Sequence, residues 1–467
     1  MTERRYIEKD RDRAYLTNNL LLPKRFVNAS VIKAALTFVL NDEEPIIDEL
    51  SGEVIGARPK TLKLWNETDN HVIVPRDFLP REQYQEFRCT FEAVPPPQFE
   101  TVRIDDHIDL RDDEQRVAYE ALLNNVSGTL NLSCGKGKTV IALKAAATFK
   151  VPTLVVVNTT ALLEQWKEEI ERHLGVRSVG ILQGTTQNWK GHPIVIAMVH
   201  TLSSRAWPLE FRQRFGLVLY DEGHHMSAPV FVLSADLFYG RRFSLTATAS
   251  RTDGLEVVYQ YHLGRVIHSN LTQELIPNTV FHMLKWEMPI EHRKLVVDRN
   301  DDISIPRVRT YIGRLEWRNN LIYEHLLPDL QEGRQILVLS HSVDHVEALH
   351  NYLSGAGAGM ITGDTPQESR MAILRNGNPI FGTFQLAREG LNKPSLDTLY
   401  VVTPFSNSND LQQAWGRIQR RFEGKKAPLV RVFEDAAFSC CVKSCGHLRS
   451  VLREFNYPYE REIWERP

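Results

Sequence analysis

The sequence predicts an α/β protein with two tandem domains, each a parallel sheet covered by helices on both faces. Continuous apolar runs occupy positions 154–157, 193–197 and 217–220, and again 335–340 and 399–402. Such runs are typical of strands that are buried on both faces of a parallel sheet. Helical patterns, such as the amphipathic stretch 161–174, separate the runs. This alternation of strand and helix indicates the α/β class.

Proline-containing stretches set the domain boundaries. Three consecutive prolines at positions 95–97 form a stiff spacer, and a polar, proline-interrupted stretch runs through 298–309. We therefore expect a small α+β accessory domain at 1–98, a first α/β domain at 99–275, a linker at 276–315 and a second α/β domain at 316–467. Within the accessory domain, strands at 61–65 and 71–74 with a turn-rich segment between them indicate a hairpin.

Composition limits the function classes. The chain has 467 residues, 42% of them hydrophobic, and a formal charge of −2, so any nucleic-acid contact must come from local basic surfaces. Five scattered cysteines form no disulfide framework and fit a reducing compartment. The charged N-terminus is no signal peptide, and we find no 18-residue apolar run. We expect a cytoplasmic protein with no membrane contact and no obligate protein partner.

The stretch 132–139, LSCGKGKT, has the composition of a phosphate-binding loop between a predicted strand, 128–131, and a predicted helix, 140–147. Glycines let successive backbone N–H groups face a polyphosphate, and the helix directs its positive end there. Lys138 would reach the outer phosphates, and the Thr139 hydroxyl would bind Mg²⁺. The alternative is a glycine-rich turn with a chance lysine, since the strict pattern has glycine where Leu132 stands. We expect the loop to bind ATP through Cys134, Gly135, Lys136, Gly137, Lys138 and Thr139.

Two acidic residues follow the predicted strand 217–220. At the carboxyl end of a parallel strand they would lie beside the phosphate loop. Asp221 would hold Mg²⁺, mostly through water, and Glu222 would orient and deprotonate the attacking water. The alternative is a pair of solvated acids that begin a loop.

Two further stretches extend the pattern. Thr246 and Thr248 could hydrogen-bond to the acidic pair and relay the nucleotide state, or could simply end a strand. In the second domain, Arg417 and Arg420 are three residues apart, on one face of a predicted helix. Guanidinium groups stabilise charge on a transferring phosphoryl group, although a solvated basic face is the alternative.

In this order, the motifs resemble those of the superfamily 2 helicases and translocases over about residues 105–435. The resemblance implies two RecA-like domains that use ATP and Mg²⁺ to step along one nucleic-acid strand. It implies catalytic roles for Asp221, Glu222, Gln413, Arg417 and Arg420, and a role for Arg111 and Gln115 in adenine binding. It implies coupling roles for His224, Thr246, Thr248 and Gly390. It implies nucleic-acid contacts by Thr159, Gln165, Thr201, His341, Gly363 and Thr383.

Finer features resemble the group that contains the XPB-type repair helicases and the UvsW-type phage helicases. They are His225 after the acidic motif, the stretch TATASRTDG at 246–254, and the accessory-domain stretch 60–79. This resemblance implies a DNA partner: a single-stranded tracking strand within branched or forked duplex. Three residues depart from the family pattern: Asn158 and Ala249 replace prolines, and Asn392 replaces an acid. The last departure bears on the coupling of ATP use to strand movement.

Three alternatives stay open from the sequence. The chain could be a duplex translocase that does not unwind, an RNA helicase, or a structural binder with an inactive ATPase site. The intact Lys138, Asp221 and Glu222 argue against the inactive binder. Trp286 and Phe405 could be wedge residues, but we expect both to be buried aromatics. The compact spacing of Cys440, Cys441, Cys445 and His447 favours a reduced helix packed on the second domain over a zinc site.

Overall fold

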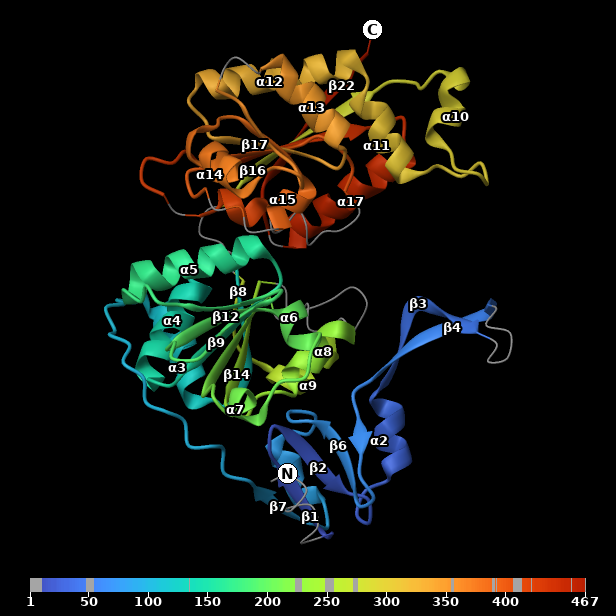
Figure 1. The fold of residues 1–467 in the computed structure, drawn as a ribbon. Helices are drawn as coiled ribbons and strands as arrows, with labels where there is room; N and C mark the ends of the chain where they lie inside the picture. The colour runs from blue at the N-terminus through green and yellow to red at the C-terminus, as the bar shows by residue number, and fades with distance from the viewer. Residues whose placement is uncertain are drawn as a thin grey trace. The chain divides into compact units, whose positions relative to one another are not determined.

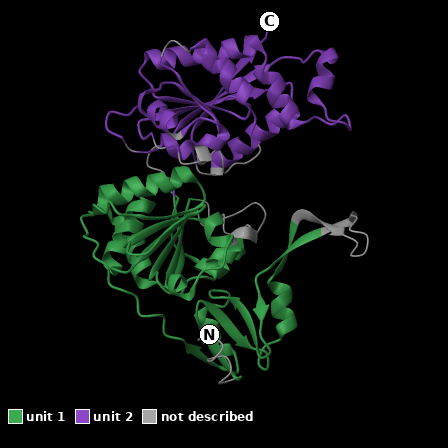
Figure 2. Ribbon diagram, in the orientation of Figure 1, with its two compact units in different colours: residues 1–132, 137–271 green, residues 133–136, 272–467 purple. Residues whose placement is uncertain are grey.

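The computed structural model describes twelve segments of the chain, which fall into two compact units (Figures 1 and 2). One unit comprises 1–132 and 137–271, and the other comprises 133–136 and 272–467. The described residues are 11–47, 54–133, 135–222, 229–247, 256–271, 276–353, 357–388, 391, 393–405, 414–420, 422–454 and 456–466.

The first α/β domain is a sheet of eight strands among the described residues, in the order β11-β10-β12-β9-β13-β14-β8-β15. Neighbouring strands are parallel, except that β11 is antiparallel to β10. The strands are β8 (Ser127–Leu132), β9 (Thr153–Val157), β10 (Gly180–Gln183), β11 (Thr186–Asn188), β12 (Ile194–Met198), β13 (Leu217–Asp221), β14 (Arg241–Thr246) and β15 (Val266–Asn270).

Helices cover both faces of this sheet, which explains the continuous apolar runs. In β9, Val155 and Val157 pack into one core, while Leu154 and Val156 pack into a second core on the opposite face. The first core is shared with α3 (Asp113–Asn124), α4 (Lys138–Phe149) and α5 (Thr160–Leu174), which lie together in Figure 1. The opposite face carries α6 (Val199–Ser203), α7 (Leu209–Arg212), α8 (Pro229–Ala235) and α9 (Glu256–Leu263).

The accessory domain combines a mixed sheet, ordered β5-β6-β2-β1-β7, with a separate two-stranded ribbon of β3 and β4 (Figure 1). Its elements are β1 (Arg13–Leu16), β2 (Asn19–Pro23), α2 (Ala29–Ala35), β3 (Thr37–Ile47), β4 (Val54–Lys63), β5 (Asn66–Glu67), β6 (His71–Pro75), η1 (Arg81–Glu86) and β7 (Thr90–Ala93).

The predicted hairpin between 61–65 and 71–74 is wrong in its pairing. Thr61–Lys63 belong to β4, which pairs with β3, whereas β6 pairs with β2 and with the two-residue β5. The local alternation identified both strands, but it carries no information about the partner. Burial decided the partner, because β6 places Val72 and Val74 in a core shared with Leu20 and Leu22 of β2.

The accessory domain is joined to the first α/β domain by buried polar contacts. Arg242 of β14 is fully buried and donates to two backbone carbonyls, that of Ala235 at 2.7 Å and that of Asn18 in the accessory domain at 3.2 Å. The Asn18 amide in turn donates to the carbonyl of Asp236. Asp77 contacts Ser127 and the backbone of Tyr261, 2.7 and 2.9 Å away. The two domains therefore form one unit.

Val232 of α8 and Val258 of α9 complete this junction, because both side chains are buried in the hydrophobic core of the accessory domain. Phe78 of the accessory domain also meets Tyr261 edge to face, with ring centroids 5.1 Å apart. The accessory domain thus covers apolar surface that the first α/β domain would otherwise expose to water.

The second α/β domain is a sheet of seven strands among the described residues, ordered β18-β19-β17-β20-β21-β16-β22 and parallel throughout. The strands are β16 (Asn278–Lys285), β17 (Ile336–Ser340), β18 (Gly359–Ile361), β19 (Ile380–Thr383), β20 (Thr398–Val401), β21 (Leu429–Asp435) and β22 (Tyr459–Glu465).

The linker assignment for 276–315 is wrong. β16 lies inside the second sheet between β21 and β22, and the same stretch contains α10 (Arg293–Val296) and α11 (Ile305–Gly313). The polar residues Asn278, Thr279 and His282 interrupt the apolar run, which hid the strand in the sequence. Thr279 and His282 are nevertheless buried, because the strand pairs on both sides.

Helices cover both faces of the second sheet as well. One face packs against α11, α12 (Glu316–Gln331) and α13 (Val343–Tyr352), and the other against α14 (Gln367–Asn376), α15 (Phe384–Arg388) and α17 (Ser439–Glu454). Cys440, Cys441 and Cys445 lie in α17, with Cys441 and Cys445 buried in these cores, which confirms the predicted helix. Trp286 and Phe405 are buried, as expected. No helix in the described ranges is long and apolar enough to cross a membrane.

A buried ion pair ties α12 to the second sheet. Arg318 and Asp435 are both fully buried, and the guanidinium Nε lies 3.0 Å from each carboxylate oxygen. Arg318 also donates to the carbonyl of Val402, at 2.8 Å, and Trp286 donates to Asp435, at 3.2 Å. These extra hydrogen bonds offset part of the cost of removing two charges from water.

We predict that Arg242→Met destabilises the first unit by about 3 kcal/mol. The substitution leaves two buried carbonyls without their hydrogen-bond donor and weakens the contact between the accessory domain and the first α/β domain. Urea denaturation would measure the change in the free energy of unfolding. Arg265→Met is the matched control, since Arg265 is exposed. Equal stability of the two variants would contradict a role for Arg242 at the domain junction.

Candidate functional site

The carboxyl ends of parallel strands bring the predicted site residues of the first domain to one edge. Asp221, the last residue of β13, is the register partner of Leu245 in β14. Thr246, the last residue of β14, is the register partner of Asn131 in β8. The phosphate loop leaves β8 directly after Leu132. The loop, the acidic pair and Thr246 therefore follow three adjacent strands.

The phosphate loop has the backbone that its glycines predict. Gly135 and Gly137 have φ values of +84° and +82°, in the left-handed region that favours glycine. α4 begins at Lys138, with Gly137 at its N-cap and no side chain capping the first turn. Leu132, which stands where the strict pattern has glycine, is the last residue of β8, and its side chain is buried in the core. The residue that departs from the strict pattern, Leu132, is therefore part of the strand and packs in the core.

Lys138 is already directed at the loop. Its Nζ donates to the carbonyl of Leu132, 2.8 Å away, so the side chain curls back over the loop that precedes it. The first turn of α4 also carries Thr139, whose hydroxyl is the predicted Mg²⁺ ligand. A phosphate group would compete with the Leu132 carbonyl for the same ammonium.

Gln115 packs directly on the phosphate loop. Its Oε1 accepts from the backbone N–H of Arg111 at 2.9 Å, while its own N–H donates to Asp112, the N-cap of α3, at 2.9 Å. A Cβ at position 137 would lie too close to Gln115 Nε2, so the end of the Gln115 side chain would have to move, and the φ of +82° at position 137 separately favours glycine. Arg111 forms a 2.8 Å ion pair with Asp112. The structure thus brings Gln115 to the loop and places Arg111 beside Gln115 and Asp112.

Asp221 is held by two donors. Its Oδ2 accepts from Trp166 Nε1 at 2.8 Å, and its Oδ1 accepts from the Glu222 backbone N–H at 3.1 Å. Burial raises the pKa of Asp221 to about 6, with a further contribution from the Glu222 charge, against the opposing effects of Trp166 and Lys138. A carboxylate whose protonation lies this close to neutrality is typical of a functional site.

Glu222 has an unusual backbone conformation. Its φ is +52°, which is uncommon for a residue with a side chain, and its N–H donates to the carbonyl of Leu245 at 2.8 Å. The turn after β13 is therefore fixed by the neighbouring strand β14. Residues in sparsely populated backbone regions cluster at functional sites, where the surrounding structure enforces them.

The donor set at this edge fits a hard divalent cation. The Asp221 carboxylate and the Thr139 hydroxyl offer oxygen ligands, which Mg²⁺ prefers, and Asp221 retains one lone pair on each oxygen beside its two donors. Magnesium sites of this kind use few protein ligands and complete the shell with water and phosphates. The residues present therefore fit Mg²⁺.

Five predicted site residues lie outside the described part of the chain. They are Cys134 of the phosphate loop, the coupling residues His224, Thr248 and Gly390, and the catalytic Gln413.

The predicted nucleic-acid contacts of the first domain follow strands β9 and β12. Thr159 is the N-cap of α5, and its hydroxyl accepts from Leu162 N–H at 3.3 Å. Thr201 is buried, and its hydroxyl accepts from Gly184 N–H at 3.1 Å. Both hydroxyls therefore also stabilise local structure. Gln165, one turn into α5, has a buried Oε1 with no hydrogen-bond partner within the described ranges.

The corresponding residues of the second domain lie at the carboxyl ends of its strands. His341 follows β17, Thr383 ends β19, and Gly363 follows β18. His341 stacks on Phe384, with ring centroids 4.2 Å apart, and its ring Nδ1 lies 3.1 Å from the hydroxyl of Thr403. Thr403, which follows β20, was missed in the sequence because a threonine after an apolar run carries no distinctive signal.

The two arginines do not share one helix. The described helical segment covers 414–418, so Arg417 is helical while Arg420 lies beyond its end. The prediction of a common helical face is wrong, because Gln419 and Arg420 form a turn and a bend. Lys425 Nζ donates to the Arg420 carbonyl at 2.7 Å and to the Pro394 carbonyl at 3.2 Å. No local pattern in the sequence predicts these two hydrogen bonds.

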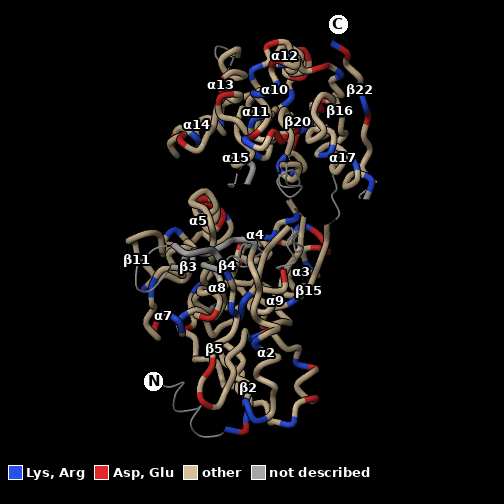
Figure 3. Tube along the Cα trace, turned by 90° about the vertical axis from the view of Figure 1, so that its right-hand side faces the viewer, with Lys and Arg blue, Asp and Glu red and all other residues tan. Residues whose placement is uncertain are grey.

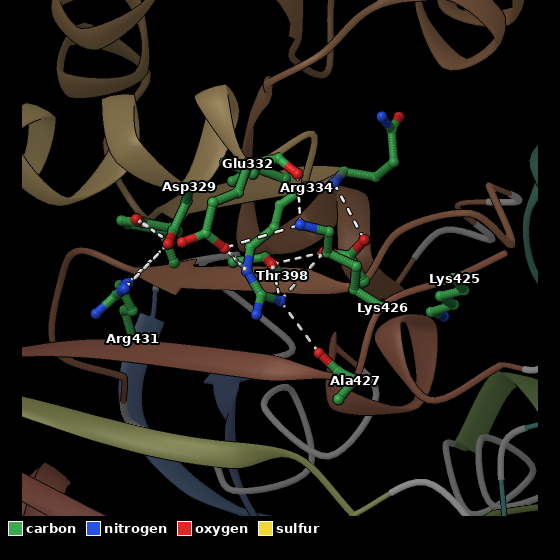
Figure 4. Close-up of polar contacts among 12 residues, drawn as sticks. Asp329, Glu332, Arg334, Thr398, Lys425, Lys426, Ala427 and Arg431 are labelled. Carbon is green, nitrogen blue, oxygen red and sulfur yellow. Dashed lines mark hydrogen bonds and ion pairs between the residues drawn. The ribbon is translucent and has the colours of Figure 1, made fainter.

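The loop that carries Lys425 is itself anchored to the sheet (Figure 4). Arg334 Nη1 donates to the carbonyl of Ala427 at 3.1 Å and to the hydroxyl of Thr398 in β20 at 3.3 Å. Close by, Arg431 donates to both oxygens of Asp329, at 2.8 and 3.0 Å. Burial lowers the pKa of Lys425 to about 8. The backbone at Arg420 is therefore held by a chain of contacts from β20.

A cluster of metal-type ligands in the second domain is better explained as a hydrogen-bond network. His282, His325 and Glu462 have ligand atoms within 4.8 Å of one another. His282 Nε2 faces Arg431 Nη1 at 3.5 Å and must accept, so its Nδ1 carries the proton toward Glu462, 2.9 Å away. The rings of His282 and His325 are tilted by 34° with centroids 4.0 Å apart, and both ring nitrogens of His282 are engaged in polar contacts. We propose no metal there.

Charge is distributed without a dominant sign. Lys and Arg residues are interspersed with Asp and Glu residues along the described trace of both units (Figure 3). Together with the formal charge of −2, this distribution offers no broad electrostatic footprint for a polyanion. Contacts to a nucleic acid would depend on backbone amides, hydroxyls and individual cations.

Family models match both α/β domains. Residues 107–251 match the model described as type III restriction enzyme, res subunit, and residues 317–421 match the helicase conserved C-terminal domain. The two matched segments include the phosphate loop, the acidic pair, Arg417 and Arg420. The matches therefore cover the nucleotide-site residues predicted from the sequence. They include no part of the accessory domain.

Several known proteins are similar to this chain. The putative ATP-dependent RNA helicase L396 of Acanthamoeba polyphaga mimivirus is 28% identical over 65% of this chain and 59% of its own length, so the chain spans under two thirds of that relative. The probable helicase D10 of Escherichia phage T5 is 27% identical over 72% of each chain. The DNA 3'-5' translocase XPB2 of Sulfurisphaera tokodaii is 36% identical over 37% of this chain and 38% of its own.

A solved structure supports the fold. The structure of S. cerevisiae Dbp5 L327V bound to RNA and ADP BeF3 has a TM-score of 0.54 at 12% identity, and the match covers 75% of this chain and 89% of that chain. At this identity the likeness concerns the fold alone, which is two domains of the RecA-like kind.

We predict that Mg²⁺-dependent ADP binding weakens as the pH falls through about 6 at limiting Mg²⁺. The raised pKa of Asp221 means that its carboxylate is charged above this pH and protonated below it. Calorimetric titration between pH 5 and pH 8 would locate the midpoint, and excess Mg²⁺ should move it downward by competing with the proton. Asp221→Asn should abolish the pH dependence; if the variant retains the midpoint, another group is responsible.

Proposed function

We propose that this chain, a superfamily 2 helicase that resembles XPB-type and phage members, couples ATP hydrolysis to movement along DNA. The observation that carries the proposal is that the loop before Lys138, which follows β8, and the pair Asp221 and Glu222, which follows β13, leave the same edge of the sheet with only β14 between their strands. This arrangement supports nucleotide binding and hydrolysis at one edge of a parallel sheet.

The ATPase chemistry follows from the residue types. Lys138 and the N–H groups of the phosphate loop would bind the phosphates, while Thr139 and Asp221 would hold Mg²⁺. When bound, Mg²⁺ neutralises charge on the phosphate oxygens. Glu222 would orient the attacking water and accept its proton. Arg417 and Arg420 would supply guanidinium groups to the transferring phosphoryl group.

We propose DNA as the track, and branched or forked DNA as the preferred substrate. The similarity to a relative named as a DNA 3'-5' translocase of the XPB type supports DNA, whereas the mimivirus relative is named as an RNA helicase. The strand contacts would involve Thr159, Gln165 and Thr201 in the first domain. In the second domain they would involve His341, Gly363 and Thr383.

The accessory domain is the proposed site of substrate selection. Its surface carries Trp65 with two lysine ammonium groups over the indole ring, Lys33 at 4.7 Å and Lys63 at 5.6 Å. Trp65 is half-buried against the core of the accessory domain, and basic side chains beside such an aromatic ring suit contact with a nucleic-acid backbone. Because this domain is joined to the first α/β domain through Arg242, DNA held there would be held by the motor domain itself.

A second candidate is a duplex translocase that does not separate strands. The match of residues 107–251 to a restriction-enzyme motor model favours it. Forked DNA carrying a labelled strand distinguishes the two candidates, because a translocase would hydrolyse ATP without releasing that strand. Plain duplex, Holliday junctions and RNA–DNA hybrids complete the panel, and preferential release from the RNA hybrids would favour an RNA helicase.

We predict that Lys138→Ala lowers DNA-stimulated ATP hydrolysis at least about 100-fold, because the ammonium that binds the phosphates is lost. Phosphate release with and without single-stranded DNA would measure this. Lys190→Ala is the control, since Lys190 lies on the surface, where it forms an exposed 3.3 Å pair with Glu210 and lies 5.0 Å from the centroid of the Trp189 ring. Equal hydrolysis by wild type and Lys138→Ala would contradict the motor.

A further inference from the structure

Trp166 makes an unusual contact for a core tryptophan. It lies on α5, its side chain is 1% exposed, and its Nε1 donates to Asp221 Oδ2 at 2.8 Å. The other oxygen of Asp221 accepts from the Glu222 N–H at 3.1 Å. The carboxylate proposed to hold Mg²⁺ is thus clamped between a backbone turn and a helix of the same unit.

The chemistry of the two groups makes this contact directional. An indole N–H can only donate, so it constrains the carboxylate to present an acceptor lone pair. A hydrogen bond to an ionised acceptor is stronger and shorter than a neutral one. Each Asp221 oxygen keeps a second lone pair for a cation or its bound water. The indole therefore fixes how the carboxylate is turned without occupying all of its acceptor sites.

The helix that carries Trp166 also carries the predicted strand contacts. Thr159 caps α5, and Gln165 directly precedes Trp166. Helical geometry places Thr159 about 10 Å from Trp166 along the axis. A buried stripe anchors α5 to the sheet along its length: Leu162, Leu163, Trp166, Ile170 and Leu174. A displacement of the N-terminal end of α5 would therefore reach Trp166 through a rigid element.

Hydrogen-bond satisfaction alone does not require a carboxylate partner. Trp207 is a buried tryptophan of the same domain, and its Nε1 donates to the backbone carbonyl of Leu202 at 2.9 Å. A backbone carbonyl is thus sufficient to satisfy a buried indole in this domain. Trp166 donates instead to a carboxylate oxygen of Asp221, a residue proposed to bind Mg²⁺ in the reaction.

We propose that Trp166 is a positioning residue that links the strand-contacting helix α5 to the Mg²⁺-binding carboxylate. DNA bound at the N-terminal end of α5 sets the position of Trp166, and Trp166 sets the orientation of Asp221. The inference rests on the proposed ATPase, and it adds a route by which strand binding reaches the nucleotide site. It assigns that route to a single hydrogen bond within the first domain.

The test compares Trp166→Phe with Trp207→Phe. Each variant removes one buried indole N–H from the same domain and keeps an aromatic ring. ATP hydrolysis is measured against Mg²⁺ concentration, with and without single-stranded DNA. For Trp166→Phe we expect the half-saturating Mg²⁺ concentration to rise about tenfold and to stop responding to DNA. For Trp207→Phe, both quantities should stay at the wild-type values.

The outcomes separate the inference from the proposed function. If wild type shows no DNA-stimulated hydrolysis, the proposed function fails. If wild type is stimulated but Trp166→Phe keeps the wild-type Mg²⁺ dependence and DNA response, the inference is wrong. A fall in maximal rate with unchanged Mg²⁺ dependence also overturns it, because that result indicates a general packing defect.

If a variant hydrolyses ATP too slowly for its Mg²⁺ dependence to be measured, a double-mutant cycle based on ADP binding provides the test. Mg²⁺-dependent ADP binding is measured for wild type, Trp166→Phe, Asp221→Ala and the double variant. If Trp166 acts through Asp221, Trp166→Phe weakens binding in the wild-type background and has no further effect beside Asp221→Ala. Additive effects would overturn the inference. Thermal unfolding of Trp166→Phe and Trp207→Phe checks that both variants remain folded.

Discussion

The parallel arrangement of strands is the constraint on which the rest of this structure depends. When neighbouring strands run in one direction, all of their carboxyl ends meet at a single edge of the sheet. In the first domain this edge collects the phosphate loop after β8, Asp221 at the end of β13 and Thr246 at the end of β14. In the second domain it collects His341 and Thr383. Residues far apart in the sequence become neighbours for this reason.

A fixed backbone supports this edge. Gly135 and Gly137 adopt conformations that favour glycine, and Gln115 fills the space that a Cβ at position 137 would need. Glu222 is held at positive φ by a hydrogen bond to β14. Preorganised donors and acceptors of this kind need little rearrangement when a ligand binds. The geometry of the loop and the acidic turn is therefore a property of the fold.

Buried polar contacts join the parts within each unit. Arg242 connects β14 to the accessory domain through two backbone carbonyls, and Arg318 connects α12 to β21 through Asp435. Breaking a buried contact of this sort leaves an uncompensated polar group and is costly. Such contacts do more to specify how the elements fit together than apolar packing alone, which tolerates many arrangements.

Much of this molecule follows from the sequence alone. The apolar runs, the loop at Lys138 and the acidic pair predicted the α/β class, the two α/β domains and the residues of the candidate nucleotide site. These features depend on short segments whose periodicity and composition are local. For the same reason, α5, β17 and β20 agree with their predicted bounds to within a few residues.

Tertiary structure alone decided the pairings that join distant segments. β16 belongs to the second sheet, although its polar residues resemble a linker, because pairing with β21 and β22 buries Thr279 and His282. β6 pairs with β2, and the Trp166 indole meets Asp221, although nothing in either local sequence names the partner. A local pattern fixes what a segment is, whereas its partner depends on which surfaces the whole chain can bury together.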